Sequence, residues 1–306
     1  MILSSLFPVF AMMLTGAVLK HFNLTGDLFL KTSDRLVYFF FFPALLFWKI
    51  GGASGSDSID LIFCIATICA VIVVYVISLI YIYFFKVPGF KAGTFSQSCY
   101  RFNSYIGIAI VLGVLGEEGV RHYGILIGFM IPVINVLSVS TLIWFSGESY
   151  DLRKRCRITI GAIVSNPLIA ACVAGLVYSR LVNHFPPFLD NTLRLMSSAT
   201  VPLSLVSIGG ALTFGALRED FKLSLAASVI KLAVFPLTGY LFYNAFGITG
   251  VPFAVGMIFF TLPTSTAIYI LSSQLGSDTK LASGTIMLST VLSFLSLSVA
   301  LLAGVD

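Results

Sequence analysis

The sequence predicts an all-α membrane protein of ten transmembrane helices, arranged as two five-helix halves of opposite topology. Three observations predict this fold. Hydrophobic residues make up 58% of the chain and charged residues only 10%, which is too little charge to cover the surface of a soluble domain. Apolar stretches of about 18 residues or more recur along the whole chain. The two halves of the chain also repeat each other in sequence.

The first half contains five predicted spans. Its opening apolar segment is longer than the core of a signal peptide and lacks a basic leader and a small-residue cleavage site, so we interpret it as a retained span. Polar or basic segments separate it from the four apolar stretches that follow. The five predicted spans are 2–20, 35–50, 59–85, 92–116 and 121–145.

The second half contains five more spans, which follow the polar and basic segment ESYDLRKRCR. The predicted spans are 159–179, 196–216, 223–246, 251–276 and 281–304. We therefore expect a first repeat over 1–145, a cytoplasmic connecting loop over 146–158 and a second repeat over 159–306.

Basic residues predict the orientation of the chain. They concentrate in the loops on one side, and the positive-inside rule assigns that side to the cytoplasm. These basic residues are Lys20, Lys31, Arg35, Lys86, Lys91, Arg153, Lys154, Arg155, Arg157, Arg218, Lys222 and Lys280. Both termini are then expected outside the cytoplasm. The expected membrane is the plasma (bacterial inner) membrane. The cluster at 153–157 is interpreted as a topology anchor and not as a nucleic-acid site.

The internal repeat predicts the arrangement of the two halves. FPVFAMMLTGAVLK (7–20) aligns with NPLIAACVAGLVYSR (166–180), and PALLFWKIGGA (43–53) aligns with PLSLVSIGGAL (202–212). FNSYIGIAIVLGVLG aligns with LPTSTAIYILSSQLG, and every match falls at a separation of 158 to 160 residues. Five is an odd number of spans, so the second half enters the membrane from the opposite side. This inverted repeat is typical of secondary transporters.

Spans four and nine are predicted to be interrupted near the middle of the membrane, as in other inverted-repeat carriers. The repeat places Asn103 opposite Pro263. Proline removes a backbone donor and clashes with the preceding turn. The short side chain of Asn103 competes for backbone hydrogen bonds, and Gly107 loosens the same region.

A new helix is expected to start at each of these two breaks, so that two helix N-termini lie there. Their free N–H groups and positive dipole ends favour an anion. Serine, threonine and asparagine are also the residues that cap helix N-termini. The residues expected at the two starts, and assigned to substrate binding together with Pro263, are Asn103, Ser104, Tyr105, Thr264, Ser265 and Thr266.

Two basic residues lie in the interior of predicted spans, away from their ends, and each has two interpretations. Arg101 either lines a watered cavity and binds a carboxylate bidentately, or extends to the cytoplasmic interface and anchors the helix. Lys231 either contacts the substrate, or pairs with helix carbonyls or a polar residue of a neighbouring span. Its repeat partner is Val71, so the first half does not duplicate it.

Enzymatic and metal chemistry find no support in the sequence. The five cysteines are scattered, and the histidines His21, His122 and His184 fall in predicted loops. No P-loop or hydrolase motif occurs, so we expect no cofactor, no metal and no enzyme activity. Every acidic residue falls at or beyond the end of a span. Proton or sodium coupling would then use neutral oxygens, the substrate's own proton, or a residue that lies deeper in the membrane than the predicted spans place it.

The sequence resembles the auxin efflux carrier family, the bacterial and archaeal relatives of the plant PIN-type exporters. The residues that carry the resemblance are PVFAMMLTGAVLK, LVYFFFFPALLFWKI, RFNSYIGIAI, NPLIAACVAGLVY, VPLSLVSIGGAL, KLAVFPL and LPTSTAIYIL. The resemblance implies ten spans in two inverted halves, with broken helices four and nine that cross each other. It also implies that the asparagine and proline of these broken helices are Asn103 and Pro263. Where many members have a further asparagine after that proline, this chain has Thr266, Ala267 and Ile268.

The resemblance also implies a division of labour. Spans one, two, six and seven would form a scaffold that often forms homodimers, and spans three to five and eight to ten a transport bundle with an elevator-like or rocking motion. Substrates would be small organic anions, such as mono- or dicarboxylates or auxin-like acids, carried by alternating access. A sodium-coupled symporter of the bile-acid type and a sensor that binds an anion without moving it are the alternatives.

Overall fold

The computed structural model describes residues 2–52, 61–145, 164–182, 184–211 and 220–304, together with 153, 157, 160 and 161. Every regular element in these residues is a helix. The chain divides into two compact units. The first comprises Met1–Asp60, Ile108–Phe129 and Val164–Leu212, and the second comprises Leu61–Gly107, Met130–Ile163 and Thr213–Asp306. Each unit therefore takes segments from both halves of the sequence.

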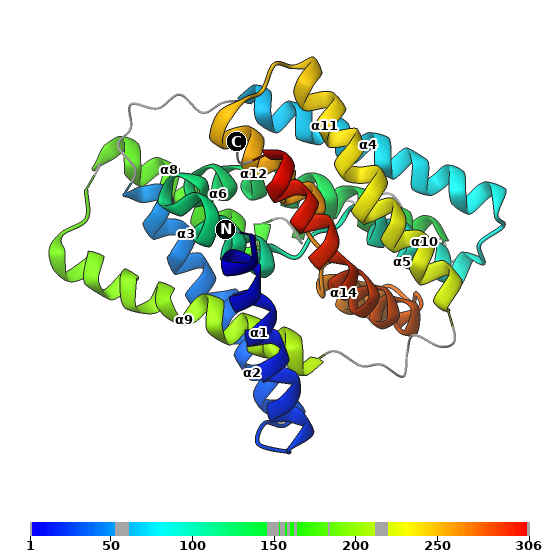
Figure 1. Ribbon diagram of the computed structural model, residues 1–306, viewed down its shortest axis with the longest axis horizontal. Helices are drawn as coiled ribbons and strands as arrows, with labels where there is room; N and C mark the ends of the chain where they lie inside the picture. The colour runs from blue at the N-terminus through cyan, green and yellow to red at the C-terminus, as the bar shows by residue number, and fades with distance from the viewer. Residues whose placement is uncertain are drawn as a thin grey trace. The chain divides into compact units, whose positions relative to one another are not determined.

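The first unit is built on α1, α3, α8 and α9. Its elements are α1 (Ile2–His21), α2 (Asp27–Leu36), the π-helix η1 (Val37–Phe41), α3 (Phe42–Gly51), α8 (Pro167–Leu181) and α9 (Pro187–Ala211). The segment α2, η1 and α3 is helical throughout. Helix α9 packs against α1, α2 and α3, and α3 also packs against α8 (Figure 1).

Close backbone contact joins α1 and α9. A methyl group on Gly16 would overlap the main chain of Val206, and one on Gly209 would overlap the carbonyl of Met13. Glycine at these two positions lets the backbones touch, which is how small residues serve helix packing in membranes. The Ser207 hydroxyl adds a hydrogen bond of 3.0 Å to the carbonyl of Leu30, which ties α2 to α9.

Polar contacts fix the end of α3. Trp48 Nε1 donates to Asp190 Oδ1 at 2.7 Å, and Lys49 forms an ion pair with Glu117. Glu117 lies in α6 (Ser104–Phe145), directly after Gly116, whose φ of 62° and ψ of −150° interrupt the helix. Glycine tolerates a positive φ that other residues adopt only with strain. Helix α6 contributes Ile108–Phe129 to the first unit and its two ends to the second.

The second unit contains the remaining helices. They are α4 (Leu61–Phe84), α5 (Gly89–Tyr100), α10 (Phe221–Val229), the π-helix η3 (Ile230–Val234), α11 (Phe235–Ala245), α12 (Gly250–Thr261), α13 (Ala267–Gln274) and α14 (Thr279–Gly304). Helix α4 packs against α5 and α11, while α14 packs against α5, α10, α12 and α13 (Figure 1). Both α5 and α12 are almost wholly buried over their second halves.

Four helical stretches in the described residues are long and apolar enough to cross a membrane. They are Leu61–Phe84, Gly89–Phe145, Phe221–Ala245 and Thr279–Leu302. Shorter apolar helices cover Leu6–His21, Pro167–Leu181 and Gly250–Thr261. The fold is thus all-α with several membrane-spanning helices, and the count of ten spans stays a prediction. The expected connecting loop, 146–158, falls almost entirely outside the described residues.

Some helices begin earlier than the predicted spans. Helix α9 starts at Pro187, although the apolar stretch begins near residue 196, and α2 precedes the span predicted from residue 35. Both early segments carry charged residues, as in the α2 sequence DLFLKTSDRL. Hydropathy marks the part of a helix that suits lipid, while helical hydrogen bonding continues into polar sequence.

Candidate functional site

Two helix interruptions lie in the second unit. Helix α5 ends at Tyr100 and α6 begins at Ser104, and α12 ends at Thr261 and α13 begins at Ala267. The residues that follow the first helix of each pair are extended, with a φ and ψ of −67° and 149° at Arg101 and of −62° and 145° at Leu262. In each pair the chain leaves the helix, runs extended for a few residues and starts a new helix.

The two interruptions are hydrogen-bonded to each other. The amide of Asn103 donates to the carbonyl of Pro263 at 2.9 Å. The Thr264 hydroxyl donates to the carbonyl of Ser98, near the end of α5, at 2.8 Å. Backbone groups that lack a helical partner are thereby satisfied by the other interruption. The residues that the sequence repeat aligns are neighbours in space.

Asn103 caps α6. Its Oδ1 accepts hydrogen bonds from the amides of Tyr105 at 3.1 Å and Ile106 at 3.2 Å, the geometry of an N-cap. Asn103 is 1% exposed, and its Nδ2 is buried with no hydrogen-bond partner among the described residues. A buried donor without an acceptor costs about 1–3 kcal/mol. The start of α6 thus presents an unused donor beside its positive dipole end.

The start of α13 is built differently. The Ser265 hydroxyl accepts a hydrogen bond from the amide of Ala267 at 3.2 Å, while Thr266 makes no side-chain cap. Thr264 is fully buried, and its amide donates to Ser289 Oγ at 3.2 Å. Ser265 and Thr266 are half-buried. Thr264 therefore has its polar groups engaged within the protein, and the partly accessible positions are Ser265 and Thr266.

Two amide side chains hold Arg101. Its Nη2 donates to Asn135 Oδ1 at 2.8 Å, and its Nη1 donates to Gln97 Oε1 at 3.3 Å. Gln97 Nε2 in turn donates to Ser272 Oγ of α13 at 2.9 Å. Gln97 connects the guanidinium to the second half-helix pair because its two ends bond in opposite directions.

The sequence reasoning missed Gln97 and Asn135. Each is a polar residue inside an apolar span, and this was the available signal. Gln97 also precedes Arg101 by one helical turn, a spacing that brings side chains together. Gly107, predicted to loosen the break, lies inside α6, where its amide donates to the carbonyl of Asn103 at 3.0 Å. Ser104 and Tyr105 form the first turn of α6 and are half-buried.

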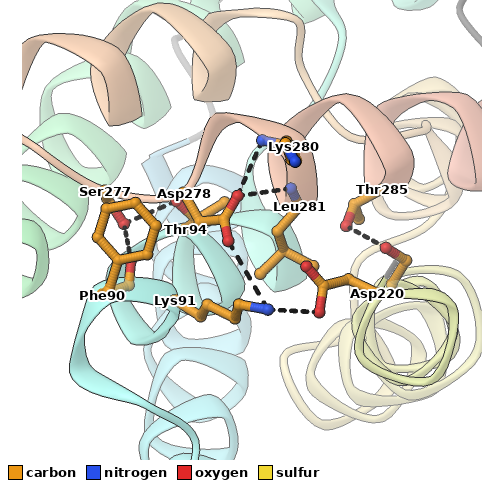
Figure 2. A network of polar contacts seen from close by, with 10 residues as sticks. Phe90, Lys91, Thr94, Asp220, Ser277, Asp278, Lys280, Leu281 and Thr285 are labelled. Carbon is orange, nitrogen blue, oxygen red and sulfur yellow. Dashed lines mark hydrogen bonds and ion pairs between the residues drawn. The ribbon is translucent and has the colours of Figure 1, made fainter. Parts of the chain in front are cut away.

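A polar network continues along α5 to its first turn. Thr94 Oγ1 lies 2.7 Å from Ser272 Oγ and 2.8 Å from Ser277 Oγ. Figure 2 shows Lys91 between two carboxylates, with its Nζ 2.6 Å from Asp220 and 3.8 Å from Asp278. A continuous set of polar side chains thus follows α5 from its basic end to the interruption.

Asp278 has a second role in this network. Its Oδ1 accepts hydrogen bonds from the amides of Lys280 at 2.8 Å and Leu281 at 3.0 Å (Figure 2). The carboxylate therefore caps α14 while it pairs with Lys91, and a negative charge is favourable at that helix end.

Lys231 contacts the helix that precedes the second interruption. It is fully buried in η3, and its Nζ donates to the carbonyl of Phe260, near the end of α12, at 3.1 Å. The Nζ also lies 4.4 Å from the centre of the Phe235 ring. The Phe260 carbonyl lies near the C-terminal end of α12, the negative end of the helix dipole.

A metal centre finds no ligand set in the described part of the chain. No group of three His, Cys, Asp or Glu side chains there is placed to hold a metal ion.

Comparison with known proteins agrees with this architecture. The profile of a family described as "Membrane transport protein" matches residues 1–301. A Methanocaldococcus jannaschii protein named an uncharacterized transporter is 23% identical over 293 residues, which is 94% of each chain. A Methanothermobacter thermautotrophicus protein with the same description is 24% identical over 303 residues, again 94% of each chain. The chain therefore belongs to the membrane transport protein family, the auxin efflux carriers whose motifs it shares.

Proposed function

We propose that the protein is a secondary carrier of a small organic anion, a mono- or dicarboxylate or auxin-like acid, bound where the two helix interruptions meet. The observation that carries the proposal is the buried, unused Nδ2 donor of Asn103 at the start of α6. A helix N-terminus with an added donor suits a carboxylate. Membership of a membrane transporter family supports the carrier role.

Arg101 supplies the positive charge in this proposal. Its guanidinium is positioned by the side-chain oxygens of Gln97 and Asn135, and in the proposed site it binds a substrate carboxylate through charge-assisted hydrogen bonds. Ser104 and Tyr105 on one side, and Ser265 and Thr266 on the other, complete the proposed site. Pro263 and Thr264 support it by bonding the two interruptions to each other. We assign Lys231 to the backbone of α12, where it donates to the Phe260 carbonyl, and not to the substrate.

The proposed carrier works by alternating access in a ten-span, five-plus-five inverted arrangement with helices four and nine crossing. Spans one, two, six and seven form the scaffold and a homodimer contact, and the other spans form the moving bundle. The protein lies in the plasma membrane, with both termini outside the cytoplasm.

Counterflow in proteoliposomes tests the function. Purified protein is reconstituted into liposomes, and the exchange of labelled mono- and dicarboxylates is measured for wild type and Arg101→Ala side by side. We expect saturable exchange in wild type and a loss of roughly 10- to 100-fold in Arg101→Ala, since a hydrogen bond to a charged group contributes about 1.5–3 kcal/mol.

Arg180→Ala is the matched control, because Arg180 is an exposed arginine of α8. It removes the same charge from a helix of the first unit and should exchange like wild type. Equal exchange by Arg101→Ala and Arg180→Ala would remove Arg101 from the site. Folded wild-type protein that binds an anion without exchanging it would be a sensor, and the carrier proposal would fail.

A further inference from the structure

Thr94 is a fully buried polar residue of α5 that lies outside the proposed anion site. It precedes Arg101 by about two helical turns. Its hydroxyl contacts Ser272 of α13 at 2.7 Å and Ser277, between α13 and α14, at 2.8 Å. The equally buried Thr290 of α14 instead donates to a carbonyl of its own helix at 2.7 Å. The Thr94 hydroxyl is therefore used for contacts between segments, and one of these leads towards Arg101.

The Phe90 carbonyl fixes the direction of these hydrogen bonds at one end. A carbonyl only accepts, and a hydroxyl has a single hydrogen to donate. The Ser277 hydroxyl donates its hydrogen to Phe90 at 2.8 Å (Figure 2). Ser277 must then accept from Thr94, and Thr94 must accept from Ser272. The hydrogen of Ser272 is thereby committed to Thr94, and its oxygen serves as an acceptor.

Arg101 fixes the direction at the other end. A guanidinium only donates, so the oxygen of the Gln97 amide must face it, and Oε1 lies 3.3 Å from Nη1. The Gln97 Nε2 then donates to Ser272 Oγ at 2.9 Å and to the Ile268 carbonyl at 3.4 Å. Both ends assign the same role to Ser272, that of an acceptor from Gln97. One donor direction therefore holds along the whole set.

This donor chain, made of Gln97, Ser272, Thr94 and Ser277, is buried throughout. A buried donor that loses its acceptor retains its desolvation cost, so a single link does not reverse while the others are in place. Removal of the Thr94 hydroxyl releases the hydrogen of Ser272, which is then free to point at the Gln97 oxygen. The amide then turns over and places its NH₂ group against the guanidinium of Arg101, which cannot accept it.

We propose that Thr94 is a positioning residue of the anion site, which acts through Ser272 and Gln97 on the orientation of Arg101. This inference rests on the proposed function, in which the guanidinium binds the substrate carboxylate. The donor chain joins α5 to α13 and to the turn that follows α13. Arg101 therefore has its binding orientation only while these segments remain in contact.

Counterflow kinetics test the proposal. Initial rates are measured against anion concentration for wild type, Thr94→Val and Thr94→Ser. Thr94→Val has a similar volume but no hydroxyl, and should raise the apparent KM about three- to tenfold with a maximal rate within about twofold of wild type. Thr94→Ser keeps the hydroxyl and should return the KM to within about twofold. A packing defect alone reduces the amount of folded carrier, which lowers the maximal rate and leaves the KM unchanged.

Thr290→Val is the matched control, because it removes a buried threonine hydroxyl of the second unit that bonds within its own helix. It should keep the wild-type KM. Thr94→Val is also combined with Arg101→Ala, and exchange is compared at low anion concentration. Since Thr94 acts through Arg101, adding Thr94→Val should change the residual rate of Arg101→Ala by less than about twofold. An independent effect multiplies the two losses and would contradict the proposal.

The outcomes separate this inference from the proposed function. If wild type exchanges an anion and Arg101→Ala is impaired, an unchanged KM in Thr94→Val, or a raised KM in Thr94→Ser, would overturn the positioning role and leave the carrier standing. Absence of exchange by folded wild type would overturn the carrier and this inference together. If Thr94→Val does not fold, Ser272→Ala decides by the same criteria. Failure of both variants to fold would assign the donor chain to stability alone and reject the positioning role.

Discussion

Asn103 has a counterpart in the chain that makes the same cap. The Oδ1 of Asn166 accepts hydrogen bonds from the amides of Leu168 at 2.9 Å and Ile169 at 3.3 Å, and so starts α8. Both asparagines are buried. Of the two, Asn103 is the one whose Nδ2 is buried without a partner. Asn166 therefore shows the capping role alone, whereas Asn103 combines the same capping role with a donor that a ligand can use.

Aspartate at each position tests that separation. It keeps the capping oxygen but replaces the Nδ2 donor by an anionic oxygen. Asn103→Asp should lose about tenfold or more in anion exchange, because a donor becomes a repulsive charge in the site. Asn166→Asp should exchange like wild type, and both should keep their melting temperatures. Similar exchange in the two variants would contradict a substrate contact by Asn103.

The sequence predicts which backbone positions meet at the interruptions, but it does not predict the hydrogen-bond partners of the buried basic side chains. The 160-residue repeat aligns Asn103 with Pro263, and main-chain atoms of the two are hydrogen-bonded. The repeat carries such information because it aligns the two interruptions with each other, and these are hydrogen-bonded to each other. The bonds from Arg101 to Asn135 and from Lys231 to Phe260 have no such signal. They depend on side-chain reach between helices distant in sequence, which periodicity does not encode.

At the scale of elements, backbone contact between α1 and α9 sets the packing of the first unit. Gly209→Ala places a methyl group on the carbonyl of Met13, and main chain yields less readily than a side chain. We expect a loss of about 1–3 kcal/mol in stability, seen as a lower melting temperature in detergent. Gly113→Ala is the control because nothing lies within 4 Å of its added methyl. A gain of up to about 1 kcal/mol is expected there, and equal effects would refute the close contact.

The network around Lys91 and Asp278 joins three helices of the second unit. Asp278→Ala removes both the cap of α14 and the ion pair, and should cost about 0.5–2 kcal/mol from the cap alone. Asp278→Asn keeps a capping oxygen and removes the charge, so it should cost less. Melting temperatures of the two variants measure the difference. An equal loss in the two variants would show that the charge, and not the cap, holds α14.

At the scale of the whole molecule, neither half of the sequence forms a unit alone. The second unit combines α4 and α5 with α10 to α14, and contacts such as that from Thr264 to Ser98 cross between the halves. We expect the fragments 1–152 and 153–306 to aggregate when expressed separately and to purify together when coexpressed. A first fragment that is monodisperse and melts cooperatively on its own would contradict this expectation.

The bond from Trp48 to Asp190 has a practical consequence for spectroscopy. The chain has two tryptophans. Trp48 belongs to the first unit, where its indole is hydrogen-bonded to a carboxylate, and Trp144 belongs to the second, where it is 72% exposed. Each unit therefore carries its own intrinsic fluorophore. Trp144→Phe leaves tryptophan emission from the first unit alone, and Trp48→Phe leaves emission from the second unit alone. Two single substitutions therefore allow the two units to be followed separately by fluorescence.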